Sequence, residues 1–218
     1  MIFMAYADWM HTGDVAWLAP RFEALKSKLL LERIGTDGLI LSDKSMQRRG
    51  DLVDWPPKER DGFVFTSVNS VVNAFQIESQ WMMAEMAVAL GKKDEASNLR
   101  HASIEGYHTY QSRFFNAQSG LYVDGLDTEH SSLHANLFPL AFGLVPEGKR
   151  DSITDWLVGR GMQCSVYAAQ YLMEALFQNG ADTEAVELMT APTDRSWRHM
   201  VEAGATITWE AWDMKYKK

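Results

Sequence analysis

The strongest constraint on the fold is the spacing of apolar residues, which follows a helical period along nearly the whole chain. Leu18, Phe22, Leu25 and Leu29 recur every three or four residues and therefore share one helix face. Strand-like alternation is limited to two short runs, 38–41 and 120–123, each bounded by turn residues. The pattern predicts an all-α chain with helices near residues 1–11, 15–34, 66–90, 94–115, 132–144, 149–159, 165–178 and 182–190.

These helices are predicted to pair as antiparallel hairpins. Short Gly-containing turns at 12–14, 91–94, 146–148 and 179–182 separate consecutive helices, because Gly ends a helix and Asp or Thr caps the next. The other connections, 35–65, 116–131 and 191–213, are long, so one end of the hairpins carries large loops, where we expect a binding site. No composition shift divides residues 1–218, which are treated as one domain. Pro139 should kink or break its helix.

Composition excludes several kinds of partner. The chain has 29 acidic and 21 basic residues, a net charge of −8, whereas binding to nucleic acid or an anionic membrane needs a basic face. We find no apolar run of about 18 residues and no signal-peptide pattern at the start. We therefore expect a soluble chain without a targeting segment, from a cytoplasmic or periplasmic protein. Cys164, the single cysteine, is interpreted as a small buried residue.

The first long connection concentrates carboxylates around a stiff Pro-Pro pair. It reads Gly50-Asp-Leu-Val-Asp-Trp-Pro-Pro-Lys-Glu-Arg-Asp-Gly-Phe, with Trp55 among the acids. Aromatic faces beside carboxylates suit a sugar ring, which presents both C–H faces and hydroxyl edges. A solvated charged loop is an equally good interpretation of the same residues.

The last connection places Glu210 between Trp209 and Trp212. A carboxylate enclosed by aromatic rings is partly desolvated, which raises its pKa and suits proton transfer near neutral pH. We therefore expect Glu210 to be a general acid or base, with the indoles available to stack on a sugar. Trp is also an ordinary core residue, so the core interpretation stays open.

The histidines do not predict a metal site. His130 and His134 are four apart, a spacing that a zinc site could use, but the intervening Ser-Ser-Leu lacks the acid of the zinc-protease pattern. We expect no metal and no cofactor. His134 can instead donate to a substrate hydroxyl.

Four stretches together resemble a known enzyme family. They are the Pro-Pro connection, His130-Ser-Ser-Leu-His-Ala-Asn, Cys164-Ser-Val-Tyr, and Gly204-Ala-Thr-Ile-Thr-Trp-Glu-Ala-Trp-Asp. They resemble the catalytic domain of bacterial α-L-rhamnosidases, glycoside hydrolase family 78, from about residue 48 onward. The resemblance implies an (α/α) barrel of six helix hairpins that hydrolyses terminal α-L-rhamnose from glycosides with inversion.

The resemblance also implies residue roles. Glu210 corresponds to the family's general base, and inversion needs a second carboxylic acid roughly 6.5–9.5 Å away. The Pro-Pro connection imitates the family's acid motif, Asp-x-x-x-x-x-Glu-Arg-x-Gly-Trp, but is one residue shorter between Asp and Glu and has Phe63 in place of Trp. We therefore expect it to bind sugar rather than supply the acid. The expected substrate-binding residues are Asp51, Asp54, Trp55, Glu59, Arg60, Asp61, His134, Tyr167, Trp197, Trp209 and Trp212.

The predicted helices make about four of the six hairpins, so we expect a partial barrel. Open barrel edges expose apolar helix flanks and favour association, so a homo-oligomer is expected. The isolated chain should bind a rhamnose-containing oligosaccharide or glycoside but turn it over weakly or not at all. Two alternatives use the same features: a non-catalytic carbohydrate-binding helical toroid, and a helical interaction scaffold.

Overall fold

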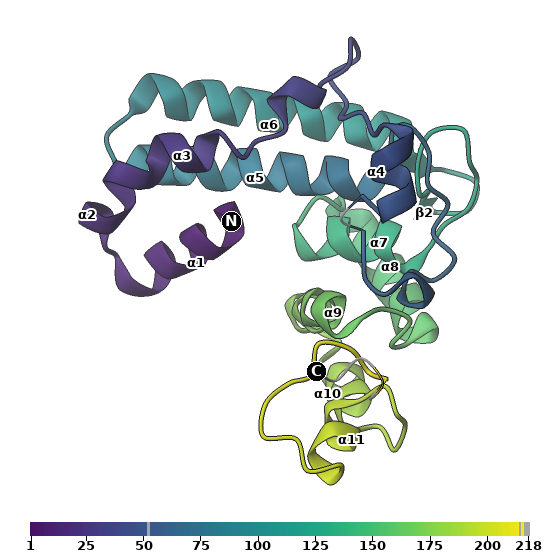
Figure 1. The fold of residues 1–218 in the computed structure, drawn as a ribbon. Coiled ribbons are helices and arrows are strands. Elements are labelled where there is room, and N and C mark those ends of the chain that lie inside the picture. Colours follow the sequence, from purple (N-terminus) through teal and green to yellow (C-terminus); the bar gives the residue numbers. More distant parts are fainter. Residues whose placement is uncertain (52, 214, 216–218) are drawn as a thin grey trace.

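The computed structural model describes residues 1–51, 53–213 and 215 and confirms the predicted all-α chain. The longest helices, α5 (Ser70–Ala89) and α6 (Lys93–Phe114), lie side by side (Figure 1). The other helices are α1 (Ile2–Thr12), α2 (Val15–Leu18), α3 (Phe22–Lys26), α4 (Lys44–Arg49), α7 (Leu133–Ala141), α8 (Glu147–Arg160), α9 (Val166–Gln178), α10 (Asp182–Thr190) and α11 (Trp197–Glu202). Short 3-10 turns cover Ala19–Arg21, Leu31–Arg33 and Pro57–Glu59.

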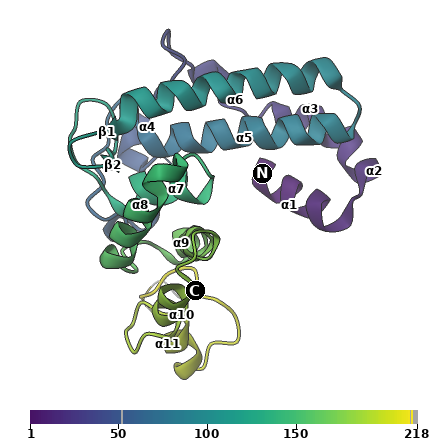
Figure 2. The ribbon, with the colours of Figure 1, turned by 180° about the vertical axis from the view of Figure 1, so that it is seen from behind.

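Within the described residues, the helices form four consecutive hairpins: α1 with α2 and α3, then α5/α6, α7/α8 and α9/α10. The turns between partners are tight, and Gly13 and Gly91 have the left-handed φ values of 66° and 71° that such turns need. The first helix of each hairpin contacts the first helix of the next, in the order α1, α5, α7, α9. The hairpins follow an open arc, with α7 to α11 continuing away from one end of α5 and α6 (Figures 1 and 2).

Aromatic rings join these four first helices. The ring centroids of Phe3 and Phe75 are 5.4 Å apart, those of Phe75 and Phe138 are 4.8 Å apart, and those of Phe138 and Tyr171 are 5.4 Å apart. Tilted and edge-on pairs at these distances are favourable beyond simple burial. The sequence stripes therefore pack hairpin against hairpin along the inside of the arc.

The segment predicted as one helix over 15–34 is divided in the structure. Helix α2 passes into a 3-10 turn that contains Pro20, and α3 ends at Lys26. Proline cannot donate a backbone hydrogen bond, which explains the change of helix type at this point. Pro139, by contrast, lies inside α7, which runs on to Ala141, so the predicted break is absent.

The long connections hold more structure than their sequences predicted. Helix α4 interrupts the first, and α11 interrupts the last. The two runs expected to be extended are found as an Ile34–Ile40 antiparallel bridge and as strand β2 (Leu121–Tyr122), which pairs with β1 (Phe115–Asn116).

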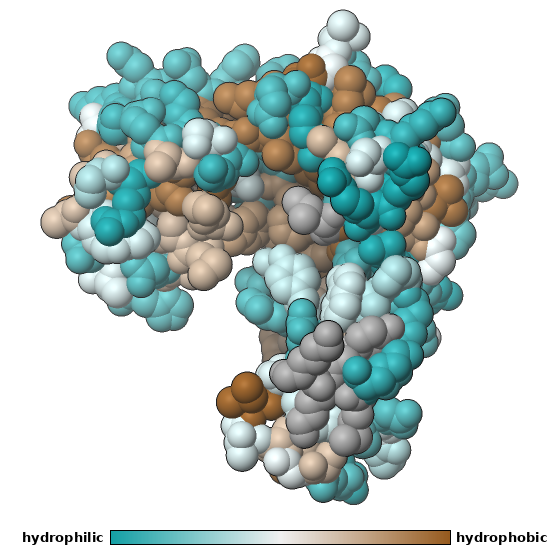
Figure 3. Space-filling view, viewed as in Figure 1, coloured by the Kyte–Doolittle hydropathy of each residue, from teal (hydrophilic) through white to brown (hydrophobic). Residues whose placement is uncertain are grey.

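Figure 3 shows hydrophilic residues over much of this face, while apolar residues reach the surface along the arm that contains α1 and at the lower end of the molecule. Among the described residues, we find no helix with both the length and the apolar character needed to cross a membrane.

Candidate active site

The Pro-Pro connection is fastened to the helices by Asp54. Its side chain is fully buried, and its Oδ2 atom lies 2.7 Å from Nε2 of His134 on α7. The backbone N–H of Ser165, just before α9, donates to the same oxygen over 2.8 Å, and the Trp55 N–H donates to Oδ1 over 2.8 Å. Because a carboxylate only accepts, the imidazole donates through Nε2. Asp54 therefore ties the connection to the starts of α7 and α9.

Asp61 makes a second attachment at the same end of α7. Its Oδ2 atom accepts from the Leu133 N–H over 2.7 Å, and its other oxygen pairs with Arg160 on α8. A carboxylate at a helix N-terminus satisfies a backbone donor and favours the helix dipole. The same ion pair raises the pKa of Arg160, first through its hydrogen bond to Asp61.

Asp124 is a third buried carboxylate, and the sequence analysis missed it. It is fully buried and accepts from the N–H groups of Val64 and Ser132, each over 2.8 Å, while His130 Nδ1 lies 2.6 Å from it. Its only sequence signal was its place after the extended run 120–123 and before the Ser cap of α7. Asp124 joins the end of the first long connection, at Val64, to the second connection and the start of α7.

Asp51 and Arg60 also bind the protein itself. Asp51 is 6% exposed and accepts from Arg33 over 2.9 Å and from the Asn69 amide over 3.2 Å. Arg60 donates from Nε to the Asp54 carbonyl over 2.7 Å and lies over the Phe65 ring. Burial lowers the pKa of Arg60. Gly50 has a φ of 89°, which favours glycine, and a side chain there would also displace the Arg60 guanidinium.

A polar pocket forms where the Pro-Pro connection meets the C-terminal segment. It has a volume of about 430 Å³ and is lined by Lys58, Glu59, Asp194, Arg195, His199, Trp212 and Asp213. Glu59 is 1% exposed, and one of its carboxylate oxygens pairs with Arg195. The other oxygen, Oε1, lies 3.9 Å from Lys58 Nζ but accepts no hydrogen bond from the described residues. A buried acceptor that lacks a hydrogen-bond donor is costly, so this oxygen is suited to receive a hydrogen bond from a ligand.

Arg195 holds the pocket together from the C-terminal side. Besides pairing with Glu59, its guanidinium donates to the carbonyl oxygens of Met162 over 2.7 Å and Cys164 over 2.9 Å. Across the rim, Lys58 lies 3.1 Å from Asp213. Hydrogen bonds from Lys215 and Lys58 lower the pKa of Asp213, so its carboxylate is ionised at the pocket edge.

The environment predicted for Glu210 is wrong. Trp209 and Trp212 are 6% and 2% exposed, respectively, whereas Glu210 between them is exposed. Trp212 packs edge-on against Trp197, and its Nε1 donates to the Cys164 carbonyl over 2.8 Å; Trp209 packs edge-on against His199. Both indoles turn into the core, which leaves the intervening carboxylate on the opposite side. The segment still meets the Pro-Pro connection, through the Lys58–Asp213 ion pair.

The other residues that were predicted to bind the sugar fall into two groups, those buried in the protein and those that are exposed or line the pocket. Asp51, Asp54 and Trp209 are buried and engaged with the protein, so direct contact with sugar hydroxyls is not supported for them. His134 is fully buried and gives Nε2 to Asp54, while its Nδ1 atom has no hydrogen-bond partner among the described residues. Five predicted residues are exposed or line the pocket and stay predictions: Trp55 and Tyr167, which are 45% and 54% exposed, Glu59, Trp212 and Glu210. Trp197 is half-buried behind Trp212, and Arg60 and Asp61 fix the connection.

Cys164 is buried, as predicted, and burial followed by the negative charge of Asp54 raises the pKa of its thiol. A thiol in that state is a poor nucleophile. In the described part of the chain, no three His, Cys, Asp or Glu side chains are placed to hold a metal ion. The pocket instead offers a carboxylate acceptor, guanidinium and ammonium donors and an imidazole, a set suited to a ligand with many hydroxyl groups.

The family model described as the bacterial alpha-L-rhamnosidase 6 hairpin glycosidase domain matches residues 1–218. The chain belongs to this family. Its hairpins, long loops and Trp-Glu-x-Trp-Asp segment are therefore parts of a six-hairpin glycosidase domain, as the resemblance implied.

Individual proteins agree with this assignment. An alpha-L-rhamnosidase of Formosa agariphila is 24% identical over 208 residues, which cover 93% of this chain and 22% of that protein. A GH78 family rhamnosidase of Bacillus sp. GL1 matches with a TM-score of 0.79 and 20% identity over 96% of this chain and 22% of that one. A rhamnosidase from Klebsiella oxytoca, solved with rhamnose bound, matches with a TM-score of 0.78 and 17% identity over 99% and 40%. The chain thus spans about a fifth of the length of the curated relative.

Proposed function

We propose that this chain forms part of the catalytic domain of an inverting α-L-rhamnosidase that acts on rhamnose-containing glycosides. The pocket around Glu59 would hold hydroxyl groups of the sugar, Trp55 would offer an exposed aromatic face, and Glu210 would activate the attacking water. The observation that carries this proposal is Glu59, a buried carboxylate that lines a polar pocket in a six-hairpin glycosidase chain and whose Oε1 atom accepts no hydrogen bond from the described residues.

The pocket chemistry supports a neutral polyol. Ionised acceptors and donors alternate around it, and a hydroxyl can both accept from Arg195 or Lys58 and donate to Glu59. Charge-assisted hydrogen bonds of this kind are stronger than neutral ones. The exposed position of Glu210 is compatible with a base that draws its water from solvent.

Binding of L-rhamnose to the 218-residue chain, measured by saturation-transfer NMR, tests the pocket. Glu59→Gln replaces the ionised acceptor with a neutral amide and should weaken binding about tenfold. Glu202→Gln is the matched control, because Glu202 is an exposed carboxylate paired with Arg198 on α11 and does not line the pocket. Equal binding of L-rhamnose by the wild-type chain and by Glu59→Gln would show that Glu59 does not contact the sugar.

Hydrolysis of p-nitrophenyl α-L-rhamnoside tests the chemistry separately. We expect weak or no turnover, because the resemblance assigns only one of the two required carboxylates, Glu210, to this chain. Any turnover should disappear in Glu210→Gln while sugar binding persists; a purely sugar-binding module would have no turnover to lose. Robust hydrolysis abolished by Glu59→Gln would instead make Glu59 the acid.

We also infer that the open ends of the arc associate with a second copy. Met1, Met4 and Met10 are 74%, 76% and 58% exposed in and beside α1, and Val201 and Ile207 are 71% and 78% exposed near the other end. Large exposed apolar patches favour association. Light scattering at micromolar concentration should give at least a dimer mass, which Met4→Lys combined with Met10→Lys should reduce; a monomer mass for the unmodified chain would reject this.

A further inference from the structure

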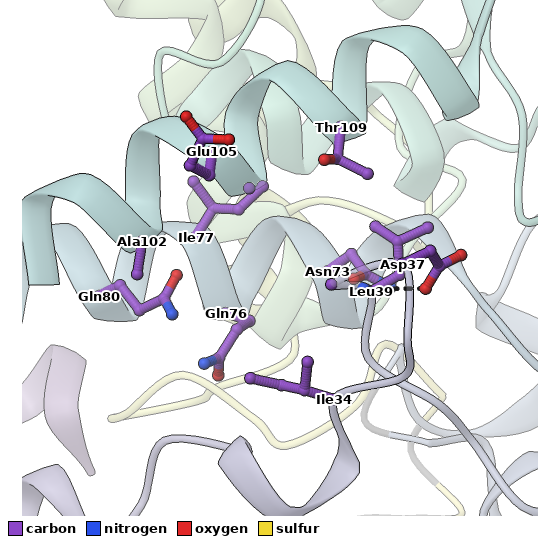
Figure 4. Close-up of a pocket in the computed structure, with 12 residues that line it drawn as sticks. Ile34, Asp37, Leu39, Asn73, Gln76, Ile77, Gln80, Ala102, Glu105 and Thr109 are labelled. Atoms are coloured by element: carbon purple, nitrogen blue, oxygen red, sulfur yellow. Dashed lines mark hydrogen bonds between the residues drawn. The ribbon is translucent and has the colours of Figure 1, made fainter.

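A second cavity lies on the α5/α6 hairpin and shares no lining residue with the Glu59 pocket. It has a volume of about 310 Å³, near the lower end of the range for small-ligand sites, roughly 300–1,000 Å³. Its walls come from the loop 34–39 on one side and from α6 on the other, with α5 between them (Figure 4).

A stripe of amide side chains on α5 attaches the preceding segment to the helix beside this cavity. Asn73 accepts from the Ile40 N–H over 2.8 Å, which positions the loop that the Ile34–Ile40 bridge closes. One turn further on, Gln76 Oε1 accepts from the Leu30 N–H over 3.0 Å. Amides here replace the apolar residues that a helix would normally bury against a loop.

The stripe leaves hydrogen-bonding capacity unused inside the cavity. Gln76 is 6% exposed, and its Nε2 atom has no partner among the described residues. Gln80, also 6% exposed, lines the same cavity, and Figure 4 shows both side chains projecting from α5. An unpaired buried donor costs free energy unless a ligand or ordered water accepts from it.

Gly106 on α6 keeps the floor of the cavity open. A Cβ atom at this position would lie 3.1 Å from Ile77 Cγ1 and 4.0 Å from Gln80 Oε1. Glycine in a helix interior costs roughly 0.5–1 kcal/mol relative to alanine. A side chain here would press on Ile77 and enter the space beside Gln80, so glycine preserves both the close approach of α6 to α5 and this part of the cavity.

The remaining lining residues indicate the class of ligand. Ile34, Leu39 and Ile77 supply aliphatic surface, while Thr109 and the carboxylate of Glu105 stand on α6. Amides, a hydroxyl and a carboxylate pair well with vicinal hydroxyl groups, each of which donates and accepts. Aliphatic side chains suit the C–H face of a ring.

We propose that this cavity is an accessory binding site for one neutral sugar ring, with Gln76 and Gln80 as the amides that contact its hydroxyls. The site is separate from the Glu59 pocket and does not depend on the proposed hydrolysis. It would let the hairpin hold a carbohydrate on the outside of the barrel wall.

The test is titration of the ¹⁵N-labelled 218-residue chain with methyl α-L-rhamnoside, D-glucose and the cationic D-glucosamine, followed by NMR of the glutamine side-chain amides. We expect saturable shifts of the Gln76 and Gln80 signals with a neutral sugar. Gln80→Leu should weaken this binding about five- to tenfold, the effect of one lost hydrogen bond. Thermal unfolding of each variant verifies that it is folded at the titration temperature.

A blocking variant separates this site from the Glu59 pocket. Ala102→Phe places a ring in the cavity and should abolish the glutamine shifts, whereas His101→Phe adds the same ring at an exposed neighbouring position outside the cavity and should keep them. Glu59→Gln should also keep them, whatever it does to the other pocket. Absence of saturable shifts, shifts that survive Ala102→Phe, or binding of glucosamine alone would overturn the proposal.

Discussion

Asp54 and Glu59 lie five residues apart in one connection, yet their carboxylates are used in opposite ways. Asp54 is surrounded by donors from His134, Ser165 and Trp55, so its hydrogen-bonding capacity serves the protein. Glu59 is also buried and lines a pocket, but it pairs with Arg195 through one oxygen, while the other lies 3.9 Å from Lys58 and accepts no hydrogen bond from the described residues. Burial alone therefore does not identify a functional carboxylate; the informative quantity is the capacity that the protein leaves unsatisfied.

The strongest test of the difference between Asp54 and Glu59 is to remove the Asp54 carboxylate. Asp54→Ala leaves two backbone N–H groups and a buried imidazole without an acceptor, so we expect unfolding to become easier by roughly 3–5 kcal/mol. Urea denaturation followed by circular dichroism measures the loss. Glu59→Gln, which keeps an acceptor for Arg195, is the internal control and should cost clearly less; equal losses would mean that both carboxylates are structural.

Glu78 is a further carboxylate, and its contribution to folding stability depends on pH. Burial, followed by repulsion from Glu174, raises the pKa of Glu78 from 4.5 to about 7. A raised folded-state pKa means that folding is undisturbed below pH 4.5 and loses stability as pH rises from there to about 7, by up to about 3 kcal/mol.

Glu78→Gln removes this titration. The variant should match the wild type near pH 4.5 and become progressively more stable than it up to pH 7, as urea titrations at several pH values can show. Glu187→Gln on α10, an exposed residue beyond the first turn of the helix, is the control and should follow the wild-type curve. Parallel curves for Glu78→Gln and the wild type would contradict the assignment.

The smallest expected effect on stability is the difference between substitutions at Trp212 and at Trp55. Trp212→Phe keeps the packing against Trp197 but loses the bond from Nε1 to the Cys164 carbonyl, a cost of about 1 kcal/mol. Trp55→Phe at the exposed position should change stability by less than about 0.5 kcal/mol. Thermal or urea unfolding distinguishes them, and a larger loss for Trp55→Phe would reverse their roles.

The longer helices could be predicted from the sequence because the apolar spacing and turn residues that define a helix are local features. The stripe and turn signals around 66–90 and 94–115 predicted α5 and α6 to within a few residues, and Gly91 marked the turn between them. The short helices α4 and α11 were missed because each has only six residues, too few to establish a period. The break after α2 could have been predicted from Pro20.

The site was harder because its decisive contacts are long-range. The motifs identified Glu59 but not Arg195, which lies 136 residues further along the chain, and identified Asp54 but not that His134, 80 residues away, would satisfy it. The tryptophans on both sides of Glu210 predicted a carboxylate enclosed by aromatic rings. In the structure the two indoles are buried in the core instead, and the Glu210 side chain is exposed. The local sequence pattern identifies which chemical groups are present. Tertiary packing determines which of these groups keep hydrogen-bonding capacity for a ligand.

The amides on α5 have a consequence for how this protein can change in evolution. Asn73 and Gln76 hold the segment 30–40 by its main chain, at Ile40 and Leu30, in addition to the burial of Leu39 and Ile40. Every residue except proline carries the N–H that these amides recognise. Substitutions at the exposed positions of that segment can therefore accumulate while its route over the helix is preserved, provided that the two amides and the buried pair remain.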